Sequence, residues 1–297
     1  MRKSGERPVD ATSFAHLSDA ARAYMGLGDD ERIMAMQRDR WVDHPYAGLA
    51  LQRMERLLGT PERERMPCMV MHGQSNIGKT LIVRKFQREH PNHFDEERGV
   101  ELRQVVAMQM PATPDQIRFY SALLFELGAP HNPKVGLAGM ERLTRDLLRR
   151  IAPRMLIVDE VHHLLSGSYR EQRASLNLLK YLANDLRMSI VLVGTADALI
   201  ALQSDSQMIS RFTPLELPRW GENDEFRRFI AAFERLIPLR KPSGLAQRDI
   251  VQYVLSVSDG VTGAVTLLLN QAAELAIRDR TEKITLVHLE HAARHVH

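Results

Sequence analysis

The sequence predicts an α/β fold, with a parallel five-stranded core sheet in the central region and a helical domain behind it. Short apolar runs alternate with stretches of helical periodicity, and these runs are PCMVMHG, LRQVVAMQM, RMLIVDE, SIVLVGT and, more weakly, FTPLELP. Runs of this kind, rich in Val, Ile and Met, are typical of parallel strands covered by helices on both faces. From Trp220 onward the apolar spacing is helical only.

The chain is expected to divide into three parts. Its 297 residues are near the length at which a chain splits into more than one domain. Residues 1–60 show helical spacings up to a Thr-Pro step and are expected to form an N-terminal helical extension. Residues 61–219 should form the α/β core, and residues 220–297 a domain of helices separated by prolines and glycines.

Composition and charge limit the class of protein. No stretch approaches the ~18 apolar residues of a membrane-spanning helix, so no membrane partner is expected. The N-terminus has positive charges but no apolar core of a secretory signal, and the single Cys68 lies in an expected buried strand. We therefore expect a cytoplasmic protein. The net charge of +3 permits a polyanionic partner but does not demonstrate one.

The stretch HGQSNIGKT, residues 72–80, directly follows the first apolar run and fills the pattern G-x-x-x-x-G-K-[ST]. In such a loop backbone N–H groups surround phosphates, and the following helix adds a favourable dipole. Lys79 is expected to reach the β- and γ-phosphates, and the Thr80 hydroxyl to bind Mg²⁺. The residues expected to hold ATP and Mg²⁺ are Gly73, Gln74, Ser75, Asn76, Ile77, Gly78, Lys79, Thr80, Leu81 and Asp159. A glycine-containing strand-to-helix turn without a ligand is the alternative.

Four residues beyond the loop complete a hydrolytic site. In the run MLIVDE, Asp159 would hold Mg²⁺, and Glu160 would polarise the attacking water as general base. Thr195, at the end of the SIVLVGT run, would orient the water or sense the γ-phosphate, although a helix N-cap also explains it. Arg211 precedes the FTPLEL run, where an arginine can act on a neighbouring subunit's nucleotide; a surface salt bridge is the alternative.

With these motifs the sequence resembles the AAA+ ATPases, and among them the TniB/TnsC-like transposition regulators of bacterial transposons, TniB being the nearer of the two. The resemblance rests on RWVDHPYAGLALQRMERLL, HGQSNIGKT, LIVDEVHHLL, VLVGT and SRFTPLEL followed by a helical stretch. It implies a P-loop NTPase core with a C-terminal helical lid. The family roles then fall on Lys79 and Thr80 as Walker A, Asp159 and Glu160 as Walker B, Thr195 as sensor 1, Arg211 as arginine finger and residues 41–46 near the adenine.

The resemblance also implies a function. ATP-bound subunits would form a ring or helical filament on double-stranded DNA without strong sequence preference and bring a transposase to its target, with hydrolysis driving release. A transposase and a targeting protein are partners on this ground alone. Residues 259–266 lack the second sensor arginine of many AAA+ proteins, which allows for slow or partner-stimulated hydrolysis. The alternatives are an AAA+ ATPase of a replication-initiator or secretion-associated pathway, and a nucleotide-gated scaffold with incidental hydrolysis.

Basic and polar side chains around the second run and behind the DE pair are the candidates for DNA contact. Phosphate contact needs only such groups, without sequence readout. The candidates are Arg103, Gln104, Arg118, Arg170 and Arg173. Ordinary solvated helix faces are the alternative.

Histidines gather at two places, directly behind Glu160 and at the C-terminus. Metal binding needs converging ligands, and the C-terminal histidines have no H-E-x-x-H arrangement. We therefore expect none of these histidines to bind a metal, and we leave open that His162 links the nucleotide site to a neighbouring subunit.

Overall fold

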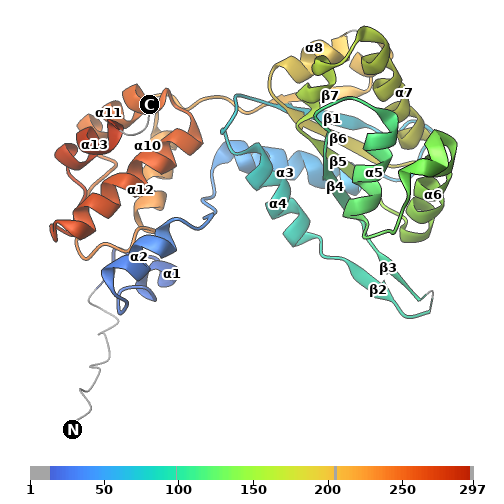
Figure 1. Ribbon diagram of the computed structural model, residues 1–297. Helices are drawn as coiled ribbons and strands as arrows, with labels where there is room; N and C mark the ends of the chain where they lie inside the picture. The colour runs from blue at the N-terminus through green and yellow to red at the C-terminus, as the bar shows by residue number, and fades with distance from the viewer. Residues whose placement is uncertain (1–13, 98, 204–205, 295–297) are drawn as a thin grey trace. The chain divides into compact units, whose positions relative to one another are not determined.

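The computed structural model describes residues 14–97, 99–203 and 206–294, and these form two units (Figure 1). One unit is Tyr46–Pro218, and the other joins the segment that ends at Pro45 to the segment that begins at Arg219. The expected division at residues 60 and 219 therefore differs at its first boundary. The described part of residues 1–60 is shared between the two units, for reasons given below.

Five parallel strands form the sheet of the larger unit, in the order β4-β5-β6-β1-β7. They are β1 (Cys68–His72), β4 (Val105–Gln109), β5 (Met155–Asp159), β6 (Ser189–Gly194) and β7 (Phe212–Glu216). Each strand lies in one of the five apolar runs, so the predicted parallel sheet is confirmed. Strands β1, β5 and β6 are buried at every position, which explains runs that are continuous rather than alternating.

Helices connect the strands of this unit and cover the sheet. They are α3 (Pro45–Leu58), α4 (Lys79–Glu89), α5 (Gln116–Glu126), η1 (Pro133–Val135), α6 (Gly136–Ile151), η2 (Val161–Ser166), α7 (Tyr169–Asp185), α8 (Asp197–Gln203) and α9 (Ser206–Ile209). Apolar residues of α5, α6 and α7, such as Leu123, Leu148 and Leu182, are fully buried with Leu156 and Leu192 of the sheet. These helices thus bury one stripe against the strands, as their sequence spacing predicts.

A two-stranded hairpin, β2 (His93–Asp95) with β3 (Val100–Leu102), was not expected from the sequence. In Figure 1 it extends away from the five-stranded sheet of its own unit. Each strand has three residues, which is too short for an alternating pattern to be recognised. The available signal was Gly99, whose φ of 63° is in the left-handed region that favours glycine in tight turns.

The smaller unit consists of helices, and the helical series expected after Trp220 is confirmed. The helices are α1 (Asp19–Arg22), α2 (Asp29–Met36), α10 (Asp224–Glu234), α11 (Arg248–Ser258), α12 (Thr262–Arg278) and α13 (Leu286–Ala293). Close backbone contact fixes the start of α12, because a Cβ on Gly260 would lie 2.3 Å from the carbonyl oxygen of Trp220. A side chain at position 260 would therefore push these two segments apart.

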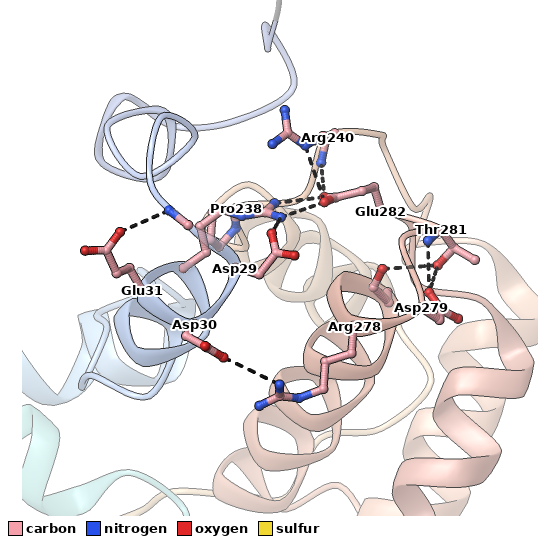
Figure 2. Close-up of polar contacts among 12 residues, drawn as sticks. Asp29, Asp30, Glu31, Pro238, Arg240, Arg278, Asp279, Thr281 and Glu282 are labelled. Carbon is pink, nitrogen blue, oxygen red and sulfur yellow. Dashed lines mark hydrogen bonds and ion pairs between the residues drawn. The ribbon is translucent and has the colours of Figure 1, made fainter. Parts of the chain in front are cut away.

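A buried arginine attaches the N-terminal segment to this unit, and Figure 2 labels its partners Asp29, Pro238 and Glu282. Arg32 of α2 is fully buried and donates to the two carboxylate oxygens of Glu282 at 2.9 and 2.6 Å. It also donates to the carbonyl oxygen of Pro238 at 3.0 Å and to Asp29 at 2.7 Å. Two charges removed from water must be paired and hydrogen-bonded in this way, so α2 packs with the C-terminal helices rather than forming a separate extension.

Two more contacts bring the rest of the segment to the same unit. Arg40 donates to the carbonyl oxygen of Leu236 at 2.8 Å and lies 4.7 Å above the ring of Phe233. The ring of His44 lies 5.2 Å from that of Trp220, and burial lowers the pKa of His44 to about 4. In the structure His44 lies against an aromatic residue of the helical unit. The expected place of residues 41–46 near the adenine stays a prediction.

No single helix of the described chain is long and apolar enough to cross a membrane. The pair α11 and α12 passes that test together by length and composition only, with a bend of 119° between the helices. Apolar residues of both helices, such as Val254 and Leu268, are fully buried within the protein.

Candidate nucleotide site

The loop between β1 and α4 has the backbone of a phosphate-binding loop. A Cβ on Gly73 would lie 2.7 Å from the carbonyl oxygen of Leu217, so only glycine fits beside the end of β7. Gly78 has a φ of 104°, and α4 begins at the next residue, Lys79. The first turn of α4 contains no acidic residue, which leaves its N–H groups and its dipole available to an anion.

The predicted ligand-binding residues occupy different places in this loop. Gln74, Ser75 and Asn76 are exposed, whereas Ile77 is buried beside Gly73. The structure therefore places three polar residues at the solvent-facing tip of the loop. Leu81 lies further along, in the first turn of α4.

The ammonium group of Lys79 is held inside the curve of the loop. Its side chain is buried, and Nζ donates to the carbonyl oxygens of Gly73 at 2.9 Å and Gln74 at 2.8 Å. Burial lowers the pKa of Lys79, and the nearby carboxylates of Asp159 and Glu160 act against that shift. The structure thus fixes a cation where the motif predicts the β- and γ-phosphates.

Thr80 and Asp159 meet although 79 residues separate them. The Thr80 hydroxyl donates to one carboxylate oxygen of Asp159 at 2.7 Å, and the other oxygen accepts from the N–H of Glu160 at 2.8 Å. Asp159 is buried at the carboxyl end of β5. A hydroxyl and a carboxylate are the hard oxygen ligands that Mg²⁺ prefers, so this pair fits the ion that the motif implies.

Glu160 follows Asp159 at the same edge of the sheet. Its φ of 57° is in the left-handed region, and this turns the chain from β5 into the 3-10 helix η2. A carboxylate oxygen of Glu160 lies 3.2 Å from Nε2 of His162. The sequence places these two residues close along the chain but does not predict this contact.

Thr195 also lies at this edge, because it directly follows β6, which is between β5 and β1 in the sheet. Gly194 is paired with His72, the residue before the phosphate loop. The Thr195 hydroxyl donates to the carboxylate of Asp197 at 3.2 Å, at the start of α8. The geometry fits a sensor position, and it fits the alternative of a residue that starts a helix.

Arg211 lies at the amino ends of the strands, whereas the phosphate loop follows their carboxyl ends. It precedes β7, whose first residue Phe212 is paired with Cys68 at the start of β1. Its guanidinium donates to the side-chain oxygen of Asn184 at 2.6 Å. The structure therefore does not bring Arg211 to the phosphate loop of its own chain, and action on a neighbouring subunit stays a prediction.

Three of the predicted DNA-contact residues gather at the starts of two adjacent helices. Arg118 is in the first turn of α5, and Arg170 and Arg173 are in the first turns of α7; all three are exposed. The side-chain amide of Gln116 donates to the carbonyl oxygen of Ala174 at 3.3 Å, which holds these two helix starts together.

The other two candidates lie apart from that group. Arg103 directly follows β3, and its guanidinium donates to Glu101 at 2.7 Å and to the carbonyl oxygen of Glu126 at 3.1 Å. Gln104 is exposed just before β4 begins, at the amino end of the strands. The structure therefore divides the predicted set into two places.

Solved structures of three proteins share this fold. The ORC1 protein of Aeropyrum pernix in complex with DNA is 19% identical, with a TM-score of 0.63 over 89% of this chain and 69% of that chain. Drosophila ORC bound to DNA is 16% identical, with a TM-score of 0.60 over 98% and 68%. Cdc6p of Pyrobaculum aerophilum is 15% identical, with a TM-score of 0.63 over 91% and 71%. These similarities confirm the predicted AAA+ fold.

Residues 32–222 match the family described as bacterial TniB protein. The match runs from α2 to the residues just after β7, so it includes the phosphate loop, both strand-end acids, Thr195 and Arg211. No curated protein matches the chain at a significant level. Because the match covers more than half of the sequence, the chain belongs to the bacterial TniB protein family and has the AAA+ fold.

Proposed function

We propose that the protein binds ATP with Mg²⁺ at the phosphate loop and hydrolyses it. The observation that carries this proposal is the convergence of three groups at one edge of the sheet: the Lys79 ammonium in the loop, the Thr80–Asp159 pair at 2.7 Å, and Glu160 beside them. This is the arrangement that phosphoryl transfer needs, namely a cation, ligands for a divalent ion and a base for water.

Each side chain has a definite task in this mechanism. Bound Mg²⁺ would supply neutralisation of phosphate charge. Lys79 would exchange its two carbonyl partners for phosphate oxygens, while Thr80 and Asp159 hold the ion through their oxygens. Glu160, one carboxylate oxygen of which lies 3.2 Å from His162, would accept the proton of the attacking water. Arg211 would complete the site of a neighbouring subunit.

Changing Glu160 to Gln is expected to preserve ATP binding and to lower turnover by about 10²–10⁴-fold, the contribution of general base catalysis. The amide keeps the size of the carboxylate but cannot accept the proton. Phosphate release and nucleotide affinity measure the two effects separately. Glu96→Gln on the exposed β2–β3 hairpin is the matched control and should behave as wild type. Equal turnover in both variants would remove Glu160 from the mechanism.

We further propose that ATP-bound subunits assemble on double-stranded DNA and bring a transposase to its target, with a targeting protein as a further partner. Family membership supports the transposition role. Two structures of the same fold are complexes with DNA, which supports the choice of DNA as partner. The exposed group Arg118, Arg170 and Arg173 offers the phosphate contacts that binding without sequence preference requires.

Binding to labelled duplex DNA of random sequence tests this role, with ATP, a non-hydrolysable analogue, ADP or no nucleotide. We expect large assemblies on DNA only with ATP or its analogue, seen in both affinity and particle size. No DNA binding in any nucleotide state would point instead to an ATPase that acts on proteins. If Glu160→Gln still assembles on DNA and keeps full biological activity, the result would favour a nucleotide-gated scaffold.

The arginine group gives a second test of DNA contact. Changing Arg118, Arg170 and Arg173 together to Ala should weaken binding to all sequences alike. If each contacts one phosphate, the slope of log affinity against log salt should fall by about 2.7. Arg103→Ala, next to strand β3, is the comparison for the triple variant and should change the slope of log affinity against log salt little. A larger effect of Arg103→Ala would move the DNA surface to that side.

A further inference from the structure

We propose that Glu160, His162 and His163 form a binding site for a transition-metal ion such as Zn²⁺. Each of these side chains offers one ligand atom, and the three atoms lie within 4.8 Å of one another. We also propose that occupation of this site stops ATP hydrolysis by holding Glu160, and this second part rests on the proposed function. From the sequence we expected no metal at these histidines, because no converging set of ligands was evident there.

The spacing of the ligand atoms supports the site. Zn²⁺ binds histidine nitrogen and carboxylate oxygen at about 2.0–2.2 Å in a tetrahedral arrangement, so two ligand atoms on one ion lie about 3.4 Å apart. The Glu160 oxygen and Nε2 of His162 are 3.2 Å apart. The ring centroids of His162 and His163 are 4.8 Å apart, whereas two imidazoles on one zinc have centroids about 5 Å apart. The Glu160–His162 pair therefore already has the separation of two ligands on one ion, and the third ligand atom, at most 4.8 Å from the others, would move closer on binding.

Hydrogen bonding leaves the correct nitrogen of His163 available. Its Nδ1 lies 3.0 Å from the carbonyl oxygen of Met110. A carbonyl only accepts, so Nδ1 carries the proton and Nε2 keeps the lone pair that a metal needs. A bond from the second ring nitrogen to a backbone carbonyl is the usual support of a metal-binding histidine.

His162 presents its Nε2 to the same place. Its Nδ1 is buried and has no hydrogen-bond partner in the part of the chain that the structure describes, so Nε2 is the nitrogen turned toward Glu160. The exposed fraction of the side chain is 27% for His162 and 36% for Glu160. Solvent can therefore reach the site, which allows entry of an ion and of water as the fourth ligand.

The ligand types separate this site from the expected Mg²⁺ site. Thr80 and Asp159 offer hard oxygen ligands, which suit Mg²⁺. Two imidazoles with one carboxylate suit Zn²⁺ or a similar transition metal. Because Glu160 would be a ligand of the second ion, its carboxylate would be held in place and would be a weaker base toward water.

Titration of the full chain with Co²⁺, followed by its visible absorption and by competition with Zn²⁺, tests the site without ATP. We expect one binding site that is lost in His162→Ala and in His163→Ala and weakened at least ~10-fold in Glu160→Gln, because the loss of even an outer-shell partner costs that much. His131→Ala is the matched control, because its Nδ1 also lies beside a backbone carbonyl, that of Ala129 at 2.9 Å. The C-terminal histidines are present in every variant, so only differences between variants count.

Turnover with Mg²⁺ and added Zn²⁺ tests the regulatory part, each rate being compared with that of the same variant without Zn²⁺. Wild type and His131→Ala should be inhibited, and His163→Ala should resist inhibition. Equal Co²⁺ binding by all variants would overturn the site, and inhibition unchanged in His163→Ala would overturn its effect on hydrolysis. A wild-type chain without ATP turnover would contradict the proposed function, while the Co²⁺ titration would still decide the site.

Discussion

Replacing Lys79 with Ala is expected to abolish nucleotide binding and, with it, hydrolysis. The buried ammonium makes two charge-assisted hydrogen bonds inside the loop, and phosphate oxygens would take the place of those carbonyls. Hydrogen bonds to a charged group contribute about 1.5–3 kcal/mol each, so two of them correspond to a loss of about 10²–10⁴ in affinity. Titration with a fluorescent ATP analogue or by calorimetry measures that loss.

A second lysine on the same helix provides the control. Lys85 of α4 pairs with Glu89 at 2.7 Å, so Lys85→Ala removes a cation of the same kind away from the loop. This variant should bind nucleotide as wild type does, and the melting temperature of both variants without nucleotide shows whether Lys79→Ala is still folded at the temperature of the titration. Nucleotide affinity that is unchanged in Lys79→Ala would contradict the assignment of the loop as the nucleotide site.

The sheet and the meeting of Thr80 with Asp159 were predictable from the sequence for a physical reason. Parallel strands that are buried on both faces produce continuous apolar runs. The carboxyl ends of such strands lie at one edge of the sheet, so residues that follow different runs are brought together without any need to know the connecting helices. The phosphate loop and the acids behind β5 follow this rule.

The contact between Glu160 and His162, and the surroundings of His163, were not predictable in this way. They depend on the left-handed backbone of Glu160 and on the 3-10 helix that follows, and a non-glycine residue with positive φ leaves no pattern in the sequence. Periodicity arguments assume regular helices or strands. Sites built on irregular backbone next to a strand end therefore appear only in the structure.

Arg32 is the other position that the sequence conceals. In the stretch DDERIMAM an arginine beside three acids suggests a solvated helix face, since arginine is almost never fully buried without a partner. Its partner Glu282 is 250 residues away, and no local pattern indicates a pair at that separation. The grouping of the N-terminal segment with the C-terminal helices was missed for this reason.

Changing Arg32 to Ala is expected to destabilise the helical unit by about 3–5 kcal/mol, the cost of leaving one partner of a buried ion pair without the other. Glu282 is buried, although the backbone N–H of Arg240 would still donate to it at 3.1 Å. Chemical denaturation without nucleotide, followed by tryptophan fluorescence, measures the change. The two tryptophans of the sequence, Trp41 and Trp220, both belong to the helical unit, so the signal reports on that unit alone.

A surface pair between α2 and α12 is the control for the buried pair of Arg32 with Glu282, which lies between α12 and α13. Arg278 of α12 lies 3.5 Å from Asp30 of α2, and both are exposed, so Arg278→Ala should shift the denaturation midpoint little (Figure 2). The double change Arg32→Met with Glu282→Leu should recover much of the stability lost in Arg32→Ala, because well-packed apolar residues can replace a buried ion pair. An Arg32→Ala variant as stable as Arg278→Ala would show that the N-terminal segment is held by its apolar contacts instead.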